Sequence, residues 1–135
     1  MPKTAPRPRI VIAKERLEHL EDLAQGAMSR TPDLADQLLT ELSRAKLVAE
    51  AALPADVVDI DRPLVYRDEA TGREVRVTLV WPENANIDAG HISVMTPIGV
   101  ALIGLQAGAR FTWETRSGEE RELIVLSVGA ESDAA

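Results

Sequence analysis

The chain of 135 residues is long enough for one folded domain, or one small domain with an appendage. Its composition, 45 % hydrophobic and 27 % charged, is that of an ordinary globular protein, and the absence of cysteine excludes disulfides and thiol catalysis and suits a reducing cytoplasm. The net charge of −7 arises entirely in residues 51–135, which hold fourteen acidic and seven basic side chains. Because such a surface repels phosphates, direct nucleic-acid binding is not expected there, and a basic protein surface is the better partner.

The first half of the chain predicts helices. Residues 1–13 place basic side chains among prolines, so we expect a flexible basic arm, followed by an antiparallel helical hairpin over residues 14–52. Two sets of apolar residues recur at the spacing of a short coiled coil. They are Leu17, Leu20, Ala24 and Ala27, and then Ala35, Leu38, Leu42, Ala45 and Ala49.

Between the two sets, Gly26 is expected to end the first helix, Thr31 to cap the second and Pro32 to begin it. Arms of about 13 to 19 residues would extend roughly 20–28 Å. A hairpin with one thin apolar stripe does not stand alone easily, so we expect it to rest on another part of the chain or on a partner.

After Pro54 the apolar residues alternate as they do in strands with one buried face. The predicted strands are residues 57–60, 64–66, 75–81, 91–94, 110–114 and 121–128. Turn signals at 68–74 and 115–120 favour antiparallel hairpins. The predicted fold class is therefore α+β, with an antiparallel sheet over residues 53–129 and a tail over 130–135.

One long segment, from His91 to Ala109, contains no Asp, Glu, Lys or Arg. It could be a membrane segment, a buried core segment or a surface reserved for another protein. Glycines and polar residues interrupt it too often for a membrane-spanning helix. Thr96 is expected to cap a short helix that begins at Pro97 and covers the sheet, which assigns most of the segment to the core but not residues 95–98.

The stretch ISVMTPIGVALIGLQAG resembles the C-terminal domain of the Gre-type transcription factors, and VTLVWPENANIDAGHISV resembles the strand and loop before it. RPRIVIAKERLEHLEDL, ELSRA and LPADVVDID are similar to the Rnk-type branch, the regulators of nucleoside diphosphate kinase. The resemblance covers about residues 7–128. It implies a helical hairpin on a C-terminal domain with an FKBP-like sheet and a short helix.

The same resemblance implies RNA polymerase as the partner. Gre factors dock this domain at the rim of the secondary channel and insert a long hairpin towards the active site. Carried over to this sequence, the docking surface is formed by Ser93, Met95, Thr96, Pro97 and Ile98. Capping of a short helix explains Thr96 and Pro97 without any partner, and sequence alone leaves both interpretations open.

Gre factors hold a catalytic metal with acidic residues at the hairpin tip. Here the tip carries Met28 and Arg30, followed by Asp33 and Asp36 on one face of the second helix. Both carboxylates also suit a helix N-terminus, and Gre hairpins are much longer. We therefore expect no metal, cofactor or catalytic residue, and a cytoplasmic regulator that competes with Gre factors for the channel. The alternatives are a transcript cleavage factor, a prolyl isomerase and a direct regulator of nucleoside diphosphate kinase.

Three further expectations concern isolated features. Asp56, Asp59 and Asp61 are interpreted as a solvated strand edge. His19 is expected on the surface of the hairpin, without a metal. The four aromatic residues are expected to serve the core rather than a proline pocket. They are Tyr66, Trp81, Phe111 and Trp113.

Overall fold

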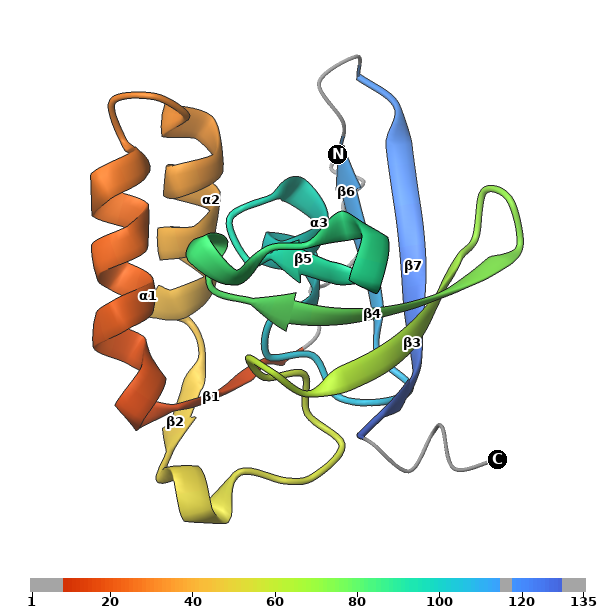
Figure 1. The fold of residues 1–135 in the computed structure, drawn as a ribbon, viewed down its shortest axis with the longest axis horizontal. Coiled ribbons are helices and arrows are strands. Elements are labelled where there is room, and N and C mark those ends of the chain that lie inside the picture. Colours follow the sequence, from red (N-terminus) through yellow and green to blue (C-terminus); the bar gives the residue numbers. More distant parts are fainter. Residues whose placement is uncertain (1–8, 115–117, 130–135) are drawn as a thin grey trace, which may run out of the picture.

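The computed structural model describes residues 9–114 and 118–129, and Figure 1 shows two helices beside a twisted sheet. The strands are β1 (Val11–Ala13), β2 (Lys46–Val48), β3 (Pro63–Asp68), β4 (Arg73–Val80), β5 (His91–Ser93), β6 (Arg110–Glu114) and β7 (Glu120–Val128). The helices are α1 (Lys14–Ala27), α2 (Pro32–Ser43) and α3 (Pro97–Leu102), with short 3₁₀ helices η1 (Glu50–Ala52), η2 (Pro82–Asn84) and η3 (Ile87–Ala89). The predicted α+β class is confirmed. The predicted tail, 130–135, and the first half of the predicted turn at 115–120 lie outside the described residues.

The main sheet has the strand order β5-β4-β3-β7-β6. β3 pairs antiparallel with β4 and β7, and β6 pairs antiparallel with β7, as the two turn signals indicated. The expectation of a purely antiparallel sheet is wrong at one edge, because β5 runs parallel to β4, with Thr78 opposite His91. The physical reason is the connection over residues 82–90, which carries the chain back before β5 begins.

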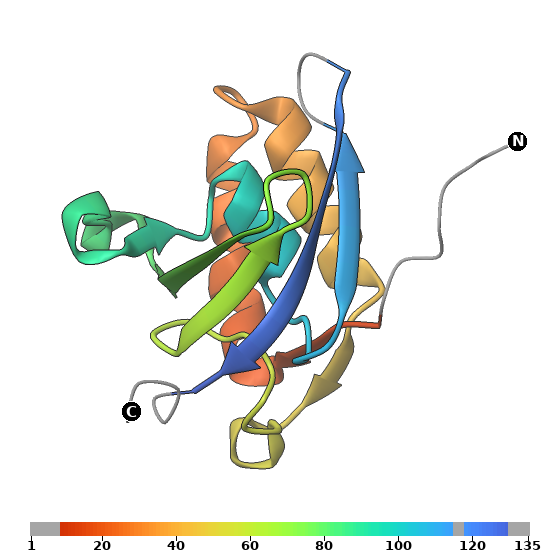
Figure 2. The same ribbon diagram turned by 90° about the vertical axis from the view of Figure 1, so that its right-hand side faces the viewer.

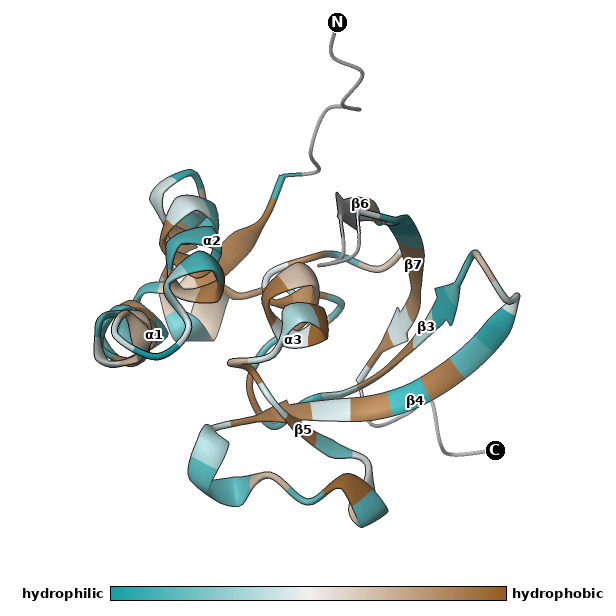
Figure 3. Ribbon diagram, turned by 90° about the horizontal axis from the view of Figure 1, so that it is seen from above, coloured by the Kyte–Doolittle hydropathy of each residue, from teal (hydrophilic) through white to brown (hydrophobic). Residues whose placement is uncertain are grey.

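Helix α3 lies against one face of this sheet, between the sheet and the helix pair formed by α1 and α2 (Figure 3). Its N-terminus forms as the sequence predicted, because Thr96 Oγ1 accepts a hydrogen bond from the Gly99 backbone N–H at 3.1 Å and Pro97 occupies the first turn. The residues from Val100 to Leu105 are all buried. The centre of the charge-free segment, from Gly99 to Leu105, is therefore core.

The helix pair shares one hydrophobic core with the sheet. Leu20 of α1 and Leu38 of α2 are fully buried, and both belong to the same cluster as Leu79 and Leu123 of the sheet. The helices also contribute three buried alanines to this cluster: Ala24, Ala27 and Ala35. The pair therefore rests on its own domain, which is one of the two outcomes that its thin apolar stripe allowed.

The helical prediction extends too far at its C-terminal end. α2 ends at Ser43, and Lys46–Val48 form a strand that pairs in parallel with Val11–Ala13. The hydrogen bond from the Lys46 N–H to the Ile10 carbonyl, 2.9 Å, helps to join the two segments. Short-range periodicity does not report such pairing, because the partner strand lies more than 30 residues away.

The same pairing corrects the N-terminal expectation. Residues 1–8 lie outside the described residues, but Ile10, Ile12 and Ala13 are buried, so the flexible arm does not extend to residue 13. Gly26 lies within the last turn of α1 and does not end it. Thr31 stands at the cap position of α2, yet its hydroxyl makes no cap hydrogen bond and instead donates to the Ala27 carbonyl at 3.4 Å.

Residues 57–60 are not a regular strand, since Val57 makes only an isolated bridge with Gln106. Their alternation arises because this loop crosses the core, where Val57, Val58 and Ile60 are buried. Among the described residues, no helix combines the length and hydrophobicity that crossing a membrane requires.

Candidate partner-binding surface

The junction between β5 and α3 contains the five residues predicted to bind a partner, and it is built around its own hydroxyl groups. Ser93 Oγ accepts a hydrogen bond from the Met95 N–H at 3.0 Å. Thr96 Oγ1 donates to the Ser93 carbonyl at 2.8 Å and accepts from the Gly99 N–H. Both hydroxyls thus shape the turn into α3, and the capping interpretation predicted this for Thr96.

Exposure differs among these five residues. Pro97 is exposed, whereas Ser93, Met95, Thr96 and Ile98 are half-buried, and Met95 and Ile98 pack against the core. The exposed part of the junction is therefore narrow. It offers a partner the ring of Pro97 and the outer edges of its neighbours.

The backbone of α3 lies very close to this junction. A Cβ atom placed on Gly99 would stand 2.6 Å from the Val94 carbonyl oxygen and 2.7 Å from that of Ser93. No side chain larger than hydrogen fits there without a backbone shift. The junction is therefore held rigidly, as a preformed surface requires.

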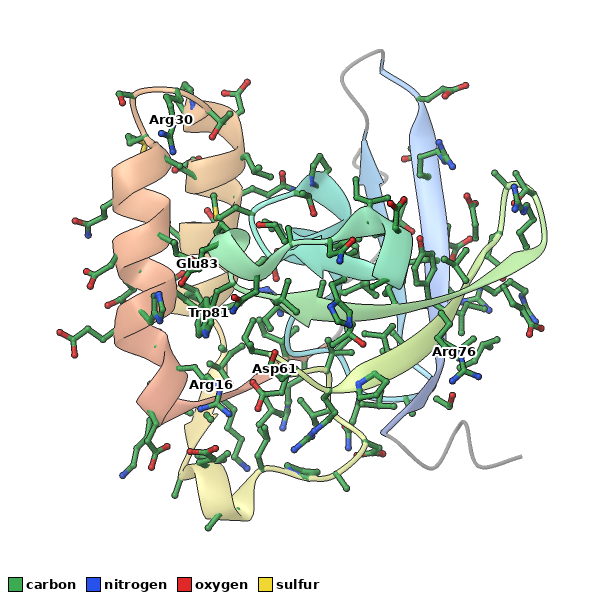
Figure 4. The ribbon with its side chains drawn as sticks, viewed as in Figure 1. Arg16, Arg30, Asp61, Arg76, Trp81 and Glu83 are labelled. Carbon is green, nitrogen blue, oxygen red and sulfur yellow. The ribbon has the colours of Figure 1, made fainter. Side chains whose placement is uncertain are left out.

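The tip of the helix pair lies at the far end of α1 from Arg16, as Figure 4 shows with the labelled Arg30. The Arg30 N–H donates to the Ala27 carbonyl at 3.0 Å, which holds the tip turn close to the end of α1. Met28 and Arg30 are exposed, and so are Asp33 and Asp36 on α2. Within the part of the chain that the structure describes, no three His, Cys, Asp or Glu residues gather into a group that could hold a metal ion.

An ionic contact at the base of the helix pair was missed by sequence reasoning. Asp59 is 5 % exposed, so its interpretation as part of a solvated strand edge is wrong, although Asp56 and Asp61 are exposed. Arg16 of α1 binds both oxygens of Asp59, with Nε 3.1 Å from Oδ1 and Nη2 3.0 Å from Oδ2. The same Nη2 lies 3.0 Å from Glu50 Oε2.

These contacts affect the guanidinium of Arg16. The hydrogen bond to Glu50 raises the pKa of Arg16, partial burial acts against that rise, and the hydrogen bond to Asp59 adds to it. The Asp59 carboxylate also accepts from the Ile60 N–H at 2.8 Å. The buried charge is thus satisfied from two sides, and it ties α1 to the loop before β3.

A ring contact lies beside this ionic cluster. His19 is exposed, as expected, and it stacks on Trp81 with ring centroids 3.7 Å apart and an interplanar angle of 16°. Trp81 follows β4, so the stack joins α1 to the C-terminal end of that strand, and Figure 4 labels Trp81 beside α1. Of the other aromatic residues, Phe111 is buried in the core and Tyr66 is half-buried against it, while the side chain of Trp113 lies outside the described set.

Comparison with known proteins gives two family matches. Residues 53–130 match the family described as "Transcription elongation factor, GreA/GreB, C-term", and residues 8–48 match the family "Rnk N-terminus". The chain is 35 % identical over 130 residues to the "Regulator of nucleoside diphosphate kinase" of Escherichia coli (strain K12), an alignment that covers 96 % of this chain and 95 % of that relative.

Two further similarities are to elongation factors. The chain is 31 % identical over 132 residues to "Transcription elongation factor GreA" of Alkalilimnicola ehrlichii, covering 91 % of this chain and 84 % of the relative. A solved structure titled "Prokaryotic transcription elongation factor GreA/GreB from Nitrosomonas europaea" is similar with a TM-score of 0.71 and 29 % identity, covering 92 % of this chain and 100 % of that one. These relatives are named as regulators or elongation factors. The chain therefore belongs to the GreA/GreB family of transcription elongation factors, in its Rnk-type branch.

Proposed function

We propose that this chain is a cytoplasmic transcription regulator that docks on RNA polymerase at the rim of the secondary channel. It occupies the place of Gre factors there and does not cleave transcripts. One observation carries the proposal: the helix pair is short and is packed along its own domain. α1 has 14 residues and α2 has 12, which corresponds to about 21 and 18 Å of helix.

The shared core limits the reach of the helix pair. Because Leu20 and Leu38 are buried in the same cluster as the sheet, the helices cannot extend from the domain without exposing that cluster. A protein docked through its sheet domain would then bring the tip only to the mouth of the channel. Occupancy of that mouth is enough to exclude a longer factor.

The chemistry of the tip supports the same function. Its exposed groups are Met28, Arg30, Asp33 and Asp36, and the two carboxylates lie on the first turns of α2, where they favour the positive end of the helix. A carboxylate contributes to metal catalysis only when it lies within bonding distance of the ion, so a short arm would separate this pair from the chemistry. Cleavage by Asp33 and Asp36 is the alternative function.

The docking surface is assigned to the junction between β5 and α3. Pro97 is its exposed centre, and the surrounding domain is acidic, so a basic patch on the partner is complementary. The acidic charge also opposes direct binding to nucleic acid.

The test is binding to core RNA polymerase, measured with the purified chain. Pro97→Lys places a positive charge at the centre of a surface that is proposed to face a basic patch, so repulsion should lower binding at least tenfold. Ala70→Lys makes the same charge change at an exposed position in the β3–β4 turn and should bind as the wild type does. Equal binding of Pro97→Lys and wild type would show that the docking surface lies elsewhere.

The other candidate functions receive less support. A prolyl isomerase needs exposed aromatic side chains around a proline, whereas Phe111 is buried, Tyr66 is half-buried and Trp81 stacks on His19. An isomerisation assay with a proline peptide tests that function. Direct control of nucleoside diphosphate kinase predicts that the kinase, rather than the polymerase, is retained by the immobilised chain.

A further inference from the structure

The segment between β4 and β5, residues 82–90, stands out from the body of the molecule in Figure 2. None of the residues in its two short helices, η2 and η3, is buried. Ile87 lies in this segment with 82 % of its surface exposed, the largest exposure of any large hydrophobic side chain that the structure describes. Because this segment covers no core, core packing does not explain its shape or the exposure of its isoleucine.

The segment is held by its own hydrogen bonds. Asn86 and His91 exchange a pair of backbone hydrogen bonds of 2.8 and 2.9 Å, and Gly90, at φ 79°, donates to the Ile87 carbonyl at 3.0 Å. The Thr78 N–H donates to the Gly90 carbonyl at 2.9 Å, which ties the segment to β4. Ile87 is therefore displayed in one arrangement before any partner arrives, and little ordering entropy is lost on binding.

The charges in the segment have one sign. Glu83, labelled in Figure 4, and Asp88 are exposed, and no Lys or Arg occurs between residues 82 and 90. An apolar side chain next to the carboxylate of Asp88, in a segment without positive charge, complements an apolar socket bordered by basic side chains. Such a socket belongs to the surface of a protein, because a phosphate backbone would be repelled.

The position of the segment connects it with the docking junction. Residues 82–90 lead into β5, the edge strand of the sheet, and the junction at Ser93 begins where β5 ends. The two therefore flank the same short strand at one edge of the domain. The junction itself exposes little beyond Pro97, so a second contact at this edge would supply apolar area that the junction lacks.

We propose that Ile87 is an anchor of the docking surface, inserted into an apolar socket on the basic protein surface that the chain binds. Asp88, next to Ile87 in η3, faces the basic border of that socket. This inference rests on the proposed function, which supplies RNA polymerase as the partner. It extends the surface to a segment outside the set expected from the sequence, which is Ser93, Met95, Thr96, Pro97 and Ile98.

The experiment compares Ile87→Ser with Leu47→Ser in binding to core RNA polymerase. Leu47 is also an exposed aliphatic side chain, 44 % exposed, but it lies on β2, outside the β5 edge. Burial of an isoleucine is worth about a 10- to 100-fold change in affinity, so Ile87→Ser should weaken binding by at least about tenfold. Leu47→Ser should change it less than about twofold. Thermal unfolding of Ile87→Ser should match the wild type, because the replaced side chain is exposed.

The outcomes separate the two proposals. If the wild type binds the polymerase and Ile87→Ser binds it equally well, Ile87 is not an anchor, but the proposed function is not contradicted. No binding by the wild type overturns both. A second copy of the chain is the alternative partner for Ile87, and sedimentation of the free chain tests it. If the wild type is a dimer that Ile87→Ser dissociates, and polymerase binding is unchanged, Ile87 contacts a second copy and the inference is contradicted.

Discussion

The helix pair and the sheet domain bury different kinds of side chain. Half of the buried hydrophobic side chains of α1 and α2 are alanines, whereas those described in the main sheet are Leu, Val and Phe. Small residues contribute little apolar area, so the helices depend on leucines such as Leu20 and Leu38 that reach the shared core. The comparison teaches that the helix pair is part of the domain rather than an independent arm.

The strongest test of this comparison is to truncate a leucine in the core that the two regions share. Leu38→Ala should lower the free energy of unfolding by about 2–5 kcal/mol, since it leaves a cavity in the shared core. Denaturant unfolding followed by circular dichroism and by tryptophan fluorescence should show one coincident transition. Met28→Ala, at the exposed tip, should change stability by less than about 0.5 kcal/mol. Two transitions with different midpoints would show that the two regions unfold separately.

Substitutions at two glycines compare the closely packed junction at α3 with the open end of α1. Gly99→Ala places a Cβ against the carbonyls of Ser93 and Val94 and should lower the free energy of unfolding by about 1–3 kcal/mol. Gly26→Ala meets no atom within 4 Å and lies in the last turn of α1, so it should stabilise the protein by up to about 1 kcal/mol. Urea midpoints measure both. A Gly99→Ala variant as stable as the wild type would mean that the junction is not rigid.

Loss of the ionic contact at the base of the helices is expected to lower the free energy of unfolding by a similar or smaller amount than Gly99→Ala does. Arg16→Ala leaves the buried carboxylate of Asp59 without its bidentate partner and should lower the free energy of unfolding by about 1–3 kcal/mol. Glu50→Gln removes a charge that is 54 % exposed and screened by solvent, so its effect should stay below about 1 kcal/mol. Equal effects of the two substitutions would contradict a role for the buried pair in joining α1 to the sheet.

The smallest expected effect concerns Asp68 at the end of β3, far from the helices. Burial acts to raise the pKa of Asp68, but hydrogen bonds from the Ala70 N–H and from Arg121 outweigh it, and the pKa lies below its ordinary value. A carboxyl with a lowered pKa stabilises the fold above its unfolded pKa and loses that contribution as the pH falls through the folded pKa. Asp68→Asn should therefore lower the Tm at neutral pH and have no effect at about pH 2.

The control for this titration is Asp88→Asn, at an exposed position outside the main sheet. It should leave the Tm nearly unchanged at either pH. A difference between wild type and Asp68→Asn that grew as the pH fell would contradict the sign of the pKa shift.

The features that sequence predicted correctly are those determined by neighbours along the chain. Thr96 caps α3 through a residue three positions away, and the alternation around Val77 and Leu79 reports one buried face of a strand. The features that it missed depend on distant partners. β2 forms because Lys46 meets Ile10, and Asp59 is buried because Arg16 meets it, and neither pairing leaves a local periodic signal.

The candidate site shows the same division. The order of residues around Pro97 indicated a surface at the start of a helix, but not that Met95 and Ile98 would turn half inwards. Exposure of Ile87 could not be predicted either, since an isoleucine in a polar loop is equally consistent with a buried and with an exposed side chain. The hydrogen bonds that close residues 82–90 decide its position, and they involve backbone groups that any sequence carries.

The central proposal is that the chain excludes Gre factors from RNA polymerase without cleaving transcripts. The most direct test uses backtracked elongation complexes, a fixed amount of a cleaving Gre factor and increasing amounts of the wild-type chain. We expect the rate of transcript cleavage to fall as the chain is added, and no shortened transcript with the chain alone. Cleavage by the chain alone, or Gre-dependent cleavage that persists at a large excess of the chain, would contradict the account.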